Sequence, residues 1–327
     1  MNFAVIGSAH GHIYEFVEDM VSLGGKFIAV YNDKTTDIAK AMSLKYSVPL
    51  VDNIDELLNL NIDIVGSSAI NSDKVSIVEE CSKRGIHIIV DKPLVINEEQ
   101  YKRLEKVVEN KKIQVGLMLA MRFMPTIHTL KKIILDNHIG SLINIEIITP
   151  HRLQAKHRLI SFFDKHKNGG IIIDLLIHNI DLFNWLTEST ISSFSGFVNE
   201  TSLHENHKFM DSAYFLVRSQ NGVSGYLRTD WHMPDSHWTW GDLRIFCVGT
   251  GGTIEVRVLG DPITKEEIIV LYKEGQPTTK IPVEECKNSS TIDFLNRINR
   301  KDYIVSHKDI LEVSRLSIEF DKDAKKK

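Results

Sequence analysis

Apolar residues follow two different periods from residue 3 to about residue 119. Short runs rich in β-branched residues alternate with stretches in which apolar residues recur every three or four positions. The runs fall at residues 3–6, 27–31, 64–66, 86–90 and 113–117. This alternation is typical of βαβ units, so it predicts an α/β domain built around a parallel sheet.

One predicted helix in this region has a clear start. Asn97 can cap it, Gln100 follows three residues later, and Leu104, Val107 and Val108 supply an apolar face. These features together are typical of a helix N-terminus. We therefore expect a helix to begin just after Asn97.

The pattern changes after Arg122. One long helix is expected to end near Gly140, and strand-like runs follow with turn signals at Asn221-Gly222 and Gly251-Gly252. The runs fall at residues 143–148, 191–198, 213–217, 223–230, 243–248, 253–258 and 268–271. Such a series predicts an α+β domain with a mainly antiparallel sheet. Helical patterns at residues 292–299 and 307–320 can pack back on the first domain. We expect two domains, residues 1–120 and 121–327, as the length of 327 residues favours.

A turn suited to phosphate follows the first predicted strand. Gly7 supplies the tight bend, Ala9 and His12 stand where a G-x-G-x-x-G motif has its other glycines, and a helical pattern follows. The helix N-terminus would face a pyrophosphate. The cofactor-side residues expected here are Gly7, Ser8, Ala9, His10, Gly11 and His12, with Ser68, Ala69 and Asn71 after the third strand.

The second strand ends at Asn32 and Asp33. A carboxylate at this place accepts hydrogen bonds from the adenosine ribose and repels a 2′-phosphate, and Asp33 does this if the strand ends one residue late. Asn32 weakens that repulsion, so NAD is preferred only slightly over NADP. An Asx turn that caps the next helix is the alternative for this pair.

His10 and His12 allow three interpretations. They can line the nicotinamide or phosphate pocket, form a structural pair, or bind metal as in zinc hydrolases with an H-x-H motif. A hydrolase needs further ligands at later strand ends of a barrel, which the antiparallel second half does not offer. We therefore expect no metal.

A charged turn, Asp91-Lys92-Pro93, follows the fourth strand. Ligands bind at the carboxyl ends of strands in an open α/β sheet, and Pro93 stiffens this turn. Lys92 can donate to a substrate oxygen and favour its developing negative charge. An ordinary surface lysine is the alternative.

Three polar residues share one face of an apolar helical pattern. Asp174, His178 and Asp181 are spaced i, i+4 and i+7. Burying such groups without partners costs on the order of several kcal/mol, so this face meets a ligand or partners. His178 suits a general base, with Asp174 orienting it or sharing the substrate hydroxyl. A helix-packing network and a metal site are the alternatives.

These features together resemble the Gfo/Idh/MocA family of oxidoreductases, which includes glucose-fructose oxidoreductase and inositol dehydrogenase. The resemblance covers nearly the whole chain. It rests on Gly7-x-Ala9, Asp91-Lys92-Pro93, Arg122-Phe123-x-Pro125 and Gly169-Gly170-x3-Asp174-x3-His178.

The resemblance implies a Rossmann domain followed by an open, mainly antiparallel sheet used in substrate binding and often in oligomerisation. Lys92 matches the catalytic lysine of the family's E-K-P motif, with Asp91 in place of glutamate. Pro93 is expected to form part of the cofactor-side turn, so Asp91, Lys92 and Pro93 are also expected to bind the cofactor. Asp174 and His178 match the acid–base pair of D-x-G-x-H, with Leu176 in place of glycine, which can narrow the substrate pocket. We expect an NAD(P)-dependent dehydrogenase acting on a sugar, polyol or inositol-like alcohol. A non-catalytic NAD(P)-binding sensor and, more remotely, a metal hydrolase are the alternatives.

Further polar residues flanked by indole rings suit sugar hydroxyls and their apolar C–H faces. Ordinary loop and sheet packing is the alternative interpretation of these stretches. The expected substrate-side residues are Arg122, His151, Arg152, Arg158, Asp181 and Trp240.

Charge and composition narrow the partners. The formal net charge of −4, with scattered Lys and Arg, gives no basic field for nucleic acid. Three widely spaced cysteines without a C-x-x-C pair fit a reducing compartment, and we read all three as structural. No cationic leader is visible, and we expect no window as apolar as a membrane span. We expect a cytoplasmic protein that forms a homodimer or homotetramer through the C-terminal sheet.

Overall fold

The chain forms two compact units in a computed structural model, which describes residues 1–32, 36–201 and 209–326. Unit 1 comprises Met1–Leu119, Leu159–Gly169 and Asn288–Arg315. Unit 2 comprises Ala120–Arg158, Gly170–Lys287 and Leu316–Lys327. The first boundary lies next to the expected one, but two segments expected in the second domain belong to unit 1.

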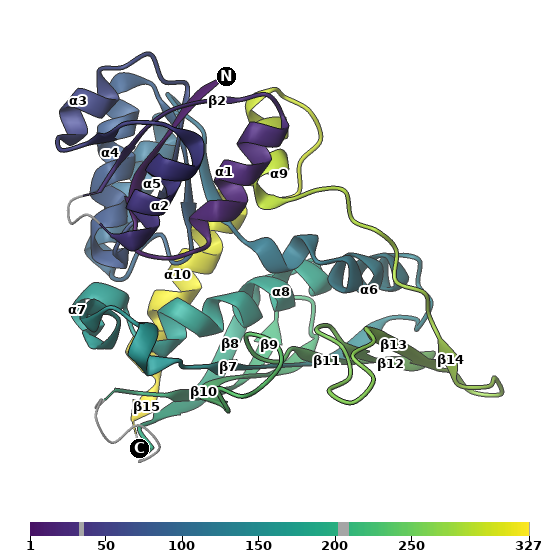
Figure 1. Cartoon of the computed structure of the whole chain (residues 1–327). Coiled ribbons are helices and arrows are strands. Elements are labelled where there is room, and N and C mark those ends of the chain that lie inside the picture. The colour runs from purple at the N-terminus through teal and green to yellow at the C-terminus, as the bar shows by residue number, and fades with distance from the viewer. Residues whose placement is uncertain (33–35, 202–208, 327) are drawn as a thin grey trace. The chain divides into compact units, whose positions relative to one another are not determined.

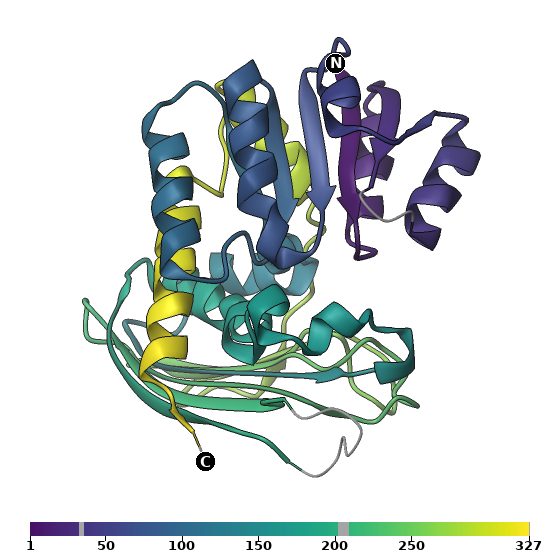
Figure 2. The same cartoon turned by 90° about the vertical axis from the view of Figure 1, so that its left-hand side faces the viewer.

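Unit 1 is built on a six-stranded parallel sheet with strand order β3-β2-β1-β4-β5-β6 (Figure 2). This is the strand order of a dinucleotide-binding Rossmann fold. The described strands are β1 (Asn2–Ser8), β2 (Lys26–Tyr31), β3 (Leu50–Val51), β4 (Ile64–Ser68), β5 (His87–Asp91) and β6 (Val115–Met118). All five strands predicted for this region are present, and β3 is additional because two residues are too short to show a period.

Helices pack on this sheet and close its core. They are α1 (Ile13–Ser22), α2 (Asp37–Tyr46), α3 (Ile54–Leu58), α4 (Lys74–Arg84), α5 (Glu98–Glu109) and α9 (Ser290–Ile298). The short helix α7 (Lys165–Asn168) of the same unit instead contacts the turn Asn71–Asp73. The start of α5 is confirmed, because the Asn97 side chain accepts from the Gln100 amide at 2.9 Å. The Gln100 side chain in turn accepts from the Ile96 amide at 3.0 Å. Together these bonds satisfy polar groups around the helix start.

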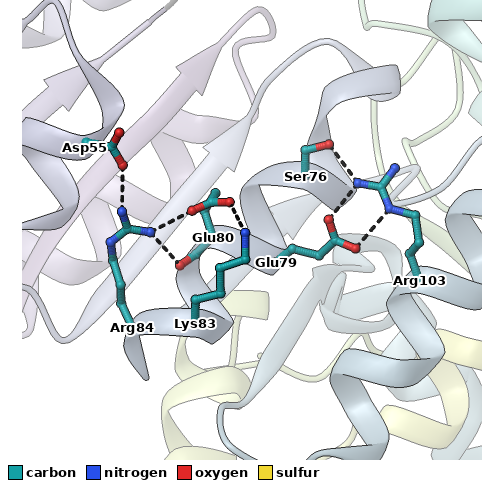
Figure 3. A network of polar contacts seen from close by, with 7 residues as sticks. All are labelled: Asp55, Ser76, Glu79, Glu80, Lys83, Arg84 and Arg103. Carbon is teal, nitrogen blue, oxygen red and sulfur yellow. Dashed lines mark hydrogen bonds and ion pairs between the residues drawn. The ribbon is translucent and has the colours of Figure 1, made fainter.

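Ion pairs on the surface of unit 1 connect three helices (Figure 3). Arg84 of α4 contacts Asp55 of α3 at 2.6 Å, and Arg103 of α5 contacts Glu79 of α4 at 2.7 Å. Exposed pairs of this kind contribute about 0–1 kcal/mol each, so they orient the helices more than they stabilise the unit.

Segments from the end of the chain complete the edge of this sheet. Arg297 of α9 donates to the Val305 carbonyl at 2.9 Å and also to the Val115 carbonyl on β6. His307, the first residue of α10 (His307–Asp323), accepts from the Val115 amide at 3.1 Å. The predicted helices at 292–299 and 307–320 are therefore present. Residues 288–315 belong to unit 1.

Unit 2 is built on a nine-stranded sheet with strand order β14-β13-β12-β11-β7-β10-β9-β8-β15 (Figure 1). Its strands are β7 (Leu142–Arg152), β8 (Ile191–Asn199), β9 (Ser212–Ser219), β10 (Ser224–Met233), β11 (Arg244–Gly249), β12 (Gly252–Arg257), β13 (Ile268–Tyr272), β14 (Thr279–Lys280) and β15 (Lys325–Lys326). The sheet is mainly antiparallel as predicted, but β7 pairs with β10, and β8 with β15, in parallel.

Two helices, α6 (Pro125–Leu135) and α8 (Ile177–Thr187), lie over one face of this sheet (Figure 1). Gly225 on β10 permits close contact with α8, because a Cβ there would lie 2.5 Å from a ring carbon of Phe183. The expected helix end near Gly140 was wrong. α6 ends at Leu135, where Asp136 already leaves the helical conformation.

One stretch, Lys165–Thr187, is long and apolar enough to span a membrane, contrary to the sequence expectation. The sequence did not suggest such a stretch, because Asp174, His178 and Asp181 interrupt its apolar residues. Its most apolar window is 83% buried inside the protein. A core helix passes the same length-and-composition test, so this finding is weak evidence for a membrane segment.

Candidate active site

The loop after β1 is tied to the end of β4 in unit 1. Gly7 has a φ of +80°, and a Cβ there would lie 2.4 Å from the Cβ of Ala69. The Ala9 amide donates to the Ser68 carbonyl at 2.7 Å, and the Ser68 hydroxyl donates to the His10 carbonyl at 2.8 Å. The predicted cofactor residues of these two loops therefore lie together, and only glycine fits at position 7.

Asn32, at the end of β2, is hydrogen-bonded to the same loop. Its side-chain Oδ1 accepts from the Ser8 amide at 2.7 Å and from the Ser8 hydroxyl at 3.2 Å. Thr36, which sequence reasoning missed, donates to the Ser8 carbonyl at 3.1 Å and caps α2. Asp33 lies outside the described residues. The side-chain oxygen of Asn32 is thus occupied by Ser8.

Asn71 lies in a short 3₁₀ turn, Asn71–Asp73, just before α4. Its side-chain amide donates to the Asn168 carbonyl at 2.9 Å. This bond ties the end of β4 to the segment 159–169 of the same unit.

Asp91, which ends β5, is buried beside a lysine that sequence reasoning missed. Lys74 is fully buried, and its ammonium contacts the Asp91 carboxylate. Burial alone raises the pKa of Asp91, but the Lys74 ammonium and the nearby imidazoles hold it well below its usual range. A signal for Lys74 existed: it shares the apolar face of Val78 and Cys81 at helical spacing.

The predicted catalytic Lys92 follows Asp91 directly. Its peptide bond to Pro93 is cis, and the Lys92 side chain is only partly buried. The Lys74 ammonium lies 3.0 Å from the Asp91 carbonyl oxygen and 3.4 Å from that of Lys92. The buried Lys74 ammonium therefore holds the backbone from which the Lys92 side chain projects.

The two histidines of the phosphate loop lie beside Asp91. The His10 and His12 rings are 4.0 Å apart, and His12 Nδ1 is 3.5 Å from Asp91 Oδ2. Potential ligand atoms of His10, His12 and Asp91 lie within 4.8 Å of one another, so the structure supplies a third ligand for the metal hypothesis. Lys74 already compensates the charge of Asp91, which weakens the attraction for a divalent cation, and we assign no metal here.

In unit 2, Asp174 and His178 are each 7% exposed, but they do not share one regular helix. Residues Ile172–Leu176 form a π-helical turn that leads into α8. π-turns are rare in proteins, and those that occur are often found at functional sites. The i, i+4 spacing did not reveal this turn, because the same apolar pattern fits an α-helix.

Asn179, next to His178, fixes α8 on the sheet. This fully buried side chain donates to the carbonyls of Ile147 at 2.9 Å and Arg228 at 3.0 Å, and accepts from the Thr149 hydroxyl at 2.7 Å. Sequence reasoning passed over Asn179 because nothing nearby in sequence contacts it. It holds the backbone beside His178 in place.

Arg122 and Asp181, both predicted on the substrate side, form a buried ion pair within unit 2. Their side chains are 2% and 3% exposed, and the guanidinium contacts the carboxylate at 2.6 Å and 3.0 Å. Arg122 also lies 5.6 Å from the centre of the Trp185 ring. This arrangement favours the helix-packing alternative for Asp181 and a structural role for both residues.

Aromatic and basic side chains gather around His151. Its ring is 4.4 Å from that of Trp240 and 5.5 Å from that of Trp231, and Arg158 lies 5.1 Å from the centre of the Trp231 ring. Burial lowers the pKa of Arg158, and the charge of Asp174 acts against this. Three of the predicted substrate residues, His151, Arg158 and Trp240, therefore lie together. Trp240 keeps 38% of its surface exposed, which suits stacking on a sugar.

Arg152 takes a different position. Its guanidinium donates to the carbonyls of Asp235 and His237, both at 3.0 Å, and so holds the loop that follows β10.

The three predicted catalytic residues are divided between the units. Lys92 belongs to unit 1, whereas Asp174 and His178 belong to unit 2.

Comparison with known families assigns the class of the protein. Residues 1–118 match the family described as oxidoreductase family, NAD-binding Rossmann fold. Residues 127–255 match the GFO/IDH/MocA C-terminal domain. The two matches cover most of the chain in the expected order. The chain belongs to the GFO/IDH/MocA family of oxidoreductases, and its first unit is an NAD-binding Rossmann domain.

Individual relatives agree with this assignment. The chain is 28% identical over 235 residues to scyllo-inositol 2-dehydrogenase (NAD(+)) of Bacillus subtilis (strain 168), covering 71% of this chain and 64% of the relative. It is 24% identical over 251 residues to inositol 2-dehydrogenase/D-chiro-inositol 3-dehydrogenase of Lactiplantibacillus plantarum, covering 74% and 66%. The matched part thus spans about two thirds or less of these curated relatives.

A solved structure matches over the full length. A protein from Erwinia carotovora atroseptica SCRI1043, described as a candidate oxidoreductase, has a TM-score of 0.90 and 25% identity, covering 100% of this chain and 99% of that one. The Rossmann and mixed-sheet units therefore occur together in a protein of the same size.

Proposed function

We propose that the protein transfers a hydride between a secondary alcohol and nicotinamide, acting on a sugar, polyol or inositol-like substrate. The relatives named inositol dehydrogenases support the substrate class. The NAD-binding family match supports the cofactor, and the occupied Asn32 leaves NAD only slightly preferred over NADP.

The residues after β1 fit a dinucleotide pyrophosphate. Gly7 keeps the chain close to Ala69, and α1 begins at Ile13 without a side-chain cap from His12, so the positive end of its dipole faces the loop. Backbone amides and a helix N-terminus suit a bound phosphate. The bound nicotinamide would accept or donate the hydride.

The chain's own residues handle the proton and the charge. In the oxidation direction His178 takes the hydroxyl proton, and Asp174 holds the imidazole or shares the hydroxyl. The Lys92 ammonium donates to the same oxygen and favours its negative charge. The His151, Arg158 and Trp240 cluster binds the rest of the substrate.

The observation that carries the proposal is the burial of two titratable groups, Asp174 and His178, around a π-helical turn of a mainly apolar helix. Buried ionisable groups need hydrogen-bond or charge partners, and such groups cluster at functional sites. The nearby sugar-compatible cluster gives that site a substrate class.

The test combines cofactor titration with a substrate screen. NADH and NADPH are titrated by fluorescence, and inositols, polyols and aldoses are then screened for a change in reduced-nicotinamide absorbance. We expect turnover with at least one cyclic or linear polyol, lost in Lys92→Ala and His178→Asn but kept in the surface control Lys45→Ala. Nucleotide binding without turnover across the panel would support the sensor, and zinc without nucleotide affinity would support the hydrolase.

A further inference from the structure

We infer that Lys74 is a positioning residue that fixes the backbone of Lys92 and joins it, through Asp91, to the phosphate-binding loop. This inference rests on the proposed function, because it assigns Lys92 a task that depends on its direction. Lys74 itself touches neither substrate nor cofactor in this scheme.

The Lys74 ammonium has three oxygen partners within reach. An ammonium has three donor hydrogens. Three oxygens lie within reach of this one: a carboxylate oxygen of Asp91, the Asp91 carbonyl and the Lys92 carbonyl. Hydrogen bonds from one ammonium to two consecutive carbonyls fix the planes of two consecutive peptide groups. They therefore set the direction in which the Lys92 side chain projects from the backbone.

Stability alone does not account for this arrangement. A buried ion pair is often no more stabilising than apolar residues of similar volume, because both charges lose their hydration. Lys74 and Asp91 are nevertheless 1% and 4% exposed. The pair contacts the backbone at Asp91 and Lys92. A precise backbone matters there for the reaction, since a misplacement of about 1 Å can cost on the order of 100-fold in rate.

Asp91 faces in two directions. One oxygen contacts Lys74, and the other lies 3.5 Å from His12 Nδ1 at the start of α1. A single carboxylate thus connects the loop expected to bind the pyrophosphate with the turn that carries Lys92. Loss of Lys74 should therefore disturb Lys92 first, whereas loss of His12 should disturb cofactor binding first.

The test uses two neutral double variants that differ in whether residue 74 can donate hydrogen bonds. Lys74→Met alone leaves a buried carboxylate without its cation and is expected to unfold more easily. Lys74→Met/Asp91→Asn and Lys74→Gln/Asp91→Asn both remove the charges, so both should fold. Only glutamine can still donate to the two carbonyls. Lys83→Met, on the exposed side of the same helix, is the matched control (Figure 3).

We expect the methionine double variant to lose about tenfold or more in kcat, with its NADH affinity and substrate KM changed by less than about threefold. The glutamine double variant should recover most of kcat, and the control should match the wild type. Equal kcat values in the two double variants, or a loss carried entirely by KM, would overturn the inference.

A second measurement needs no substrate. Lysine side chains are reductively methylated with ¹³C, and the Lys92 signal is assigned by its loss in Lys92→Ala. We expect this signal to move toward the exposed-lysine position in the methionine double variant and to stay in place in the glutamine one. An unmoved Lys92 signal in both double variants would overturn the inference that Lys74 positions Lys92. If the double variants show the expected signals but the wild type turns over no substrate, the inference stands and the proposed function fails.

Discussion

Arg122 and Asp181 bind each other inside unit 2 through two guanidinium nitrogens, at 2.6 Å and 3.0 Å, with both side chains buried. Removing one partner leaves the other charged and buried without compensation, which costs about 3–5 kcal/mol. Removing both with apolar residues of similar size is often neutral. The pair therefore makes α8 sensitive to either single substitution.

We predict that Arg122→Met lowers the free energy of unfolding of unit 2 by about 3–5 kcal/mol and that Arg122→Met/Asp181→Leu recovers most of it. All four tryptophans, residues 185, 231, 238 and 240, lie in unit 2, so urea titrations followed by tryptophan fluorescence report on this unit. Lys280→Met, which breaks an exposed pair with Glu266 in the same unit, is the control and should cost less than about 1 kcal/mol. A double variant as unstable as Arg122→Met would contradict the prediction.

Asn32 offers a direct test of the cofactor preference. Its Oδ1 receives the Ser8 amide, and an aspartate in its place keeps that acceptor while adding a negative charge. A carboxylate at this strand end repels the 2′-phosphate of NADP. We predict that Asn32→Asp weakens NADPH binding by about tenfold or more and leaves NADH binding within about threefold, measured by fluorescence titration.

Thr36→Val provides the control, because it removes the bond to the Ser8 carbonyl without adding charge. It should weaken both nucleotides alike. If Asn32→Asp also weakens them equally, Asn32 shapes the loop but does not discriminate between the cofactors.

Much of this architecture could be predicted from local pattern. Every predicted strand is present, because strand and helix periods are properties of neighbouring residues. The Asn97 cap is present for the same reason, since donor and acceptor lie three residues apart. The parallel pairing of β7 with β10 could not be predicted, because consecutive strands with turn signals suggest only antiparallel neighbours.

The candidate site was only partly predictable. The pairing of Arg122 with Asp181 spans 59 positions, and that of Lys74 with Asp91 spans 17, so no local period reveals either. The π-turn at Asp174 is hidden because α- and π-turns bury the same apolar residues. The sequence supplied the titratable groups, and the tertiary fold decides which of them are compensated.

His307 should make the stability of unit 1 depend on pH. Burial and the Arg297 cation lower its pKa from 6.5 to about 4, and the neutral imidazole is the form that accepts from the Val115 amide. Because the folded-state pKa is the lower one, the unfolded chain binds the proton first as pH falls. The contribution of His307 is therefore complete above pH 6.5 and is lost as pH falls toward 4.

We predict a loss of about 2 kcal/mol across this window, less than the full shift implies because the side chain is partly exposed. His307→Gln keeps an acceptor but does not titrate. The difference in unfolding free energy between wild type and variant, followed by far-ultraviolet circular dichroism, should grow as pH falls below 6.5. A difference that is constant with pH would show that His307 titrates normally.

The face of the unit 2 sheet opposite α6 and α8 should form an interface between copies of the chain. Leu216, Tyr226, Glu146 and Phe246 are neighbours in register on β9, β10, β7 and β11. Leu216 is 65% and Phe246 37% exposed, whereas the adjacent row on the helix-covered face is buried. Exposed apolar residues on a wide sheet face are typical of an association surface.

We predict that the wild type is a dimer or tetramer by light scattering after size exclusion, and that Leu216→Glu/Phe246→Glu shifts it toward the 37.2 kDa monomer. The charge of two glutamates facing two more across a twofold axis disfavours association without touching the buried face. Ile263→Glu, which changes an 89% exposed residue in the loop after β12, should leave the assembly intact. A wild type that is already monomeric, or an unchanged mass in the double variant, would rule out this face as the interface.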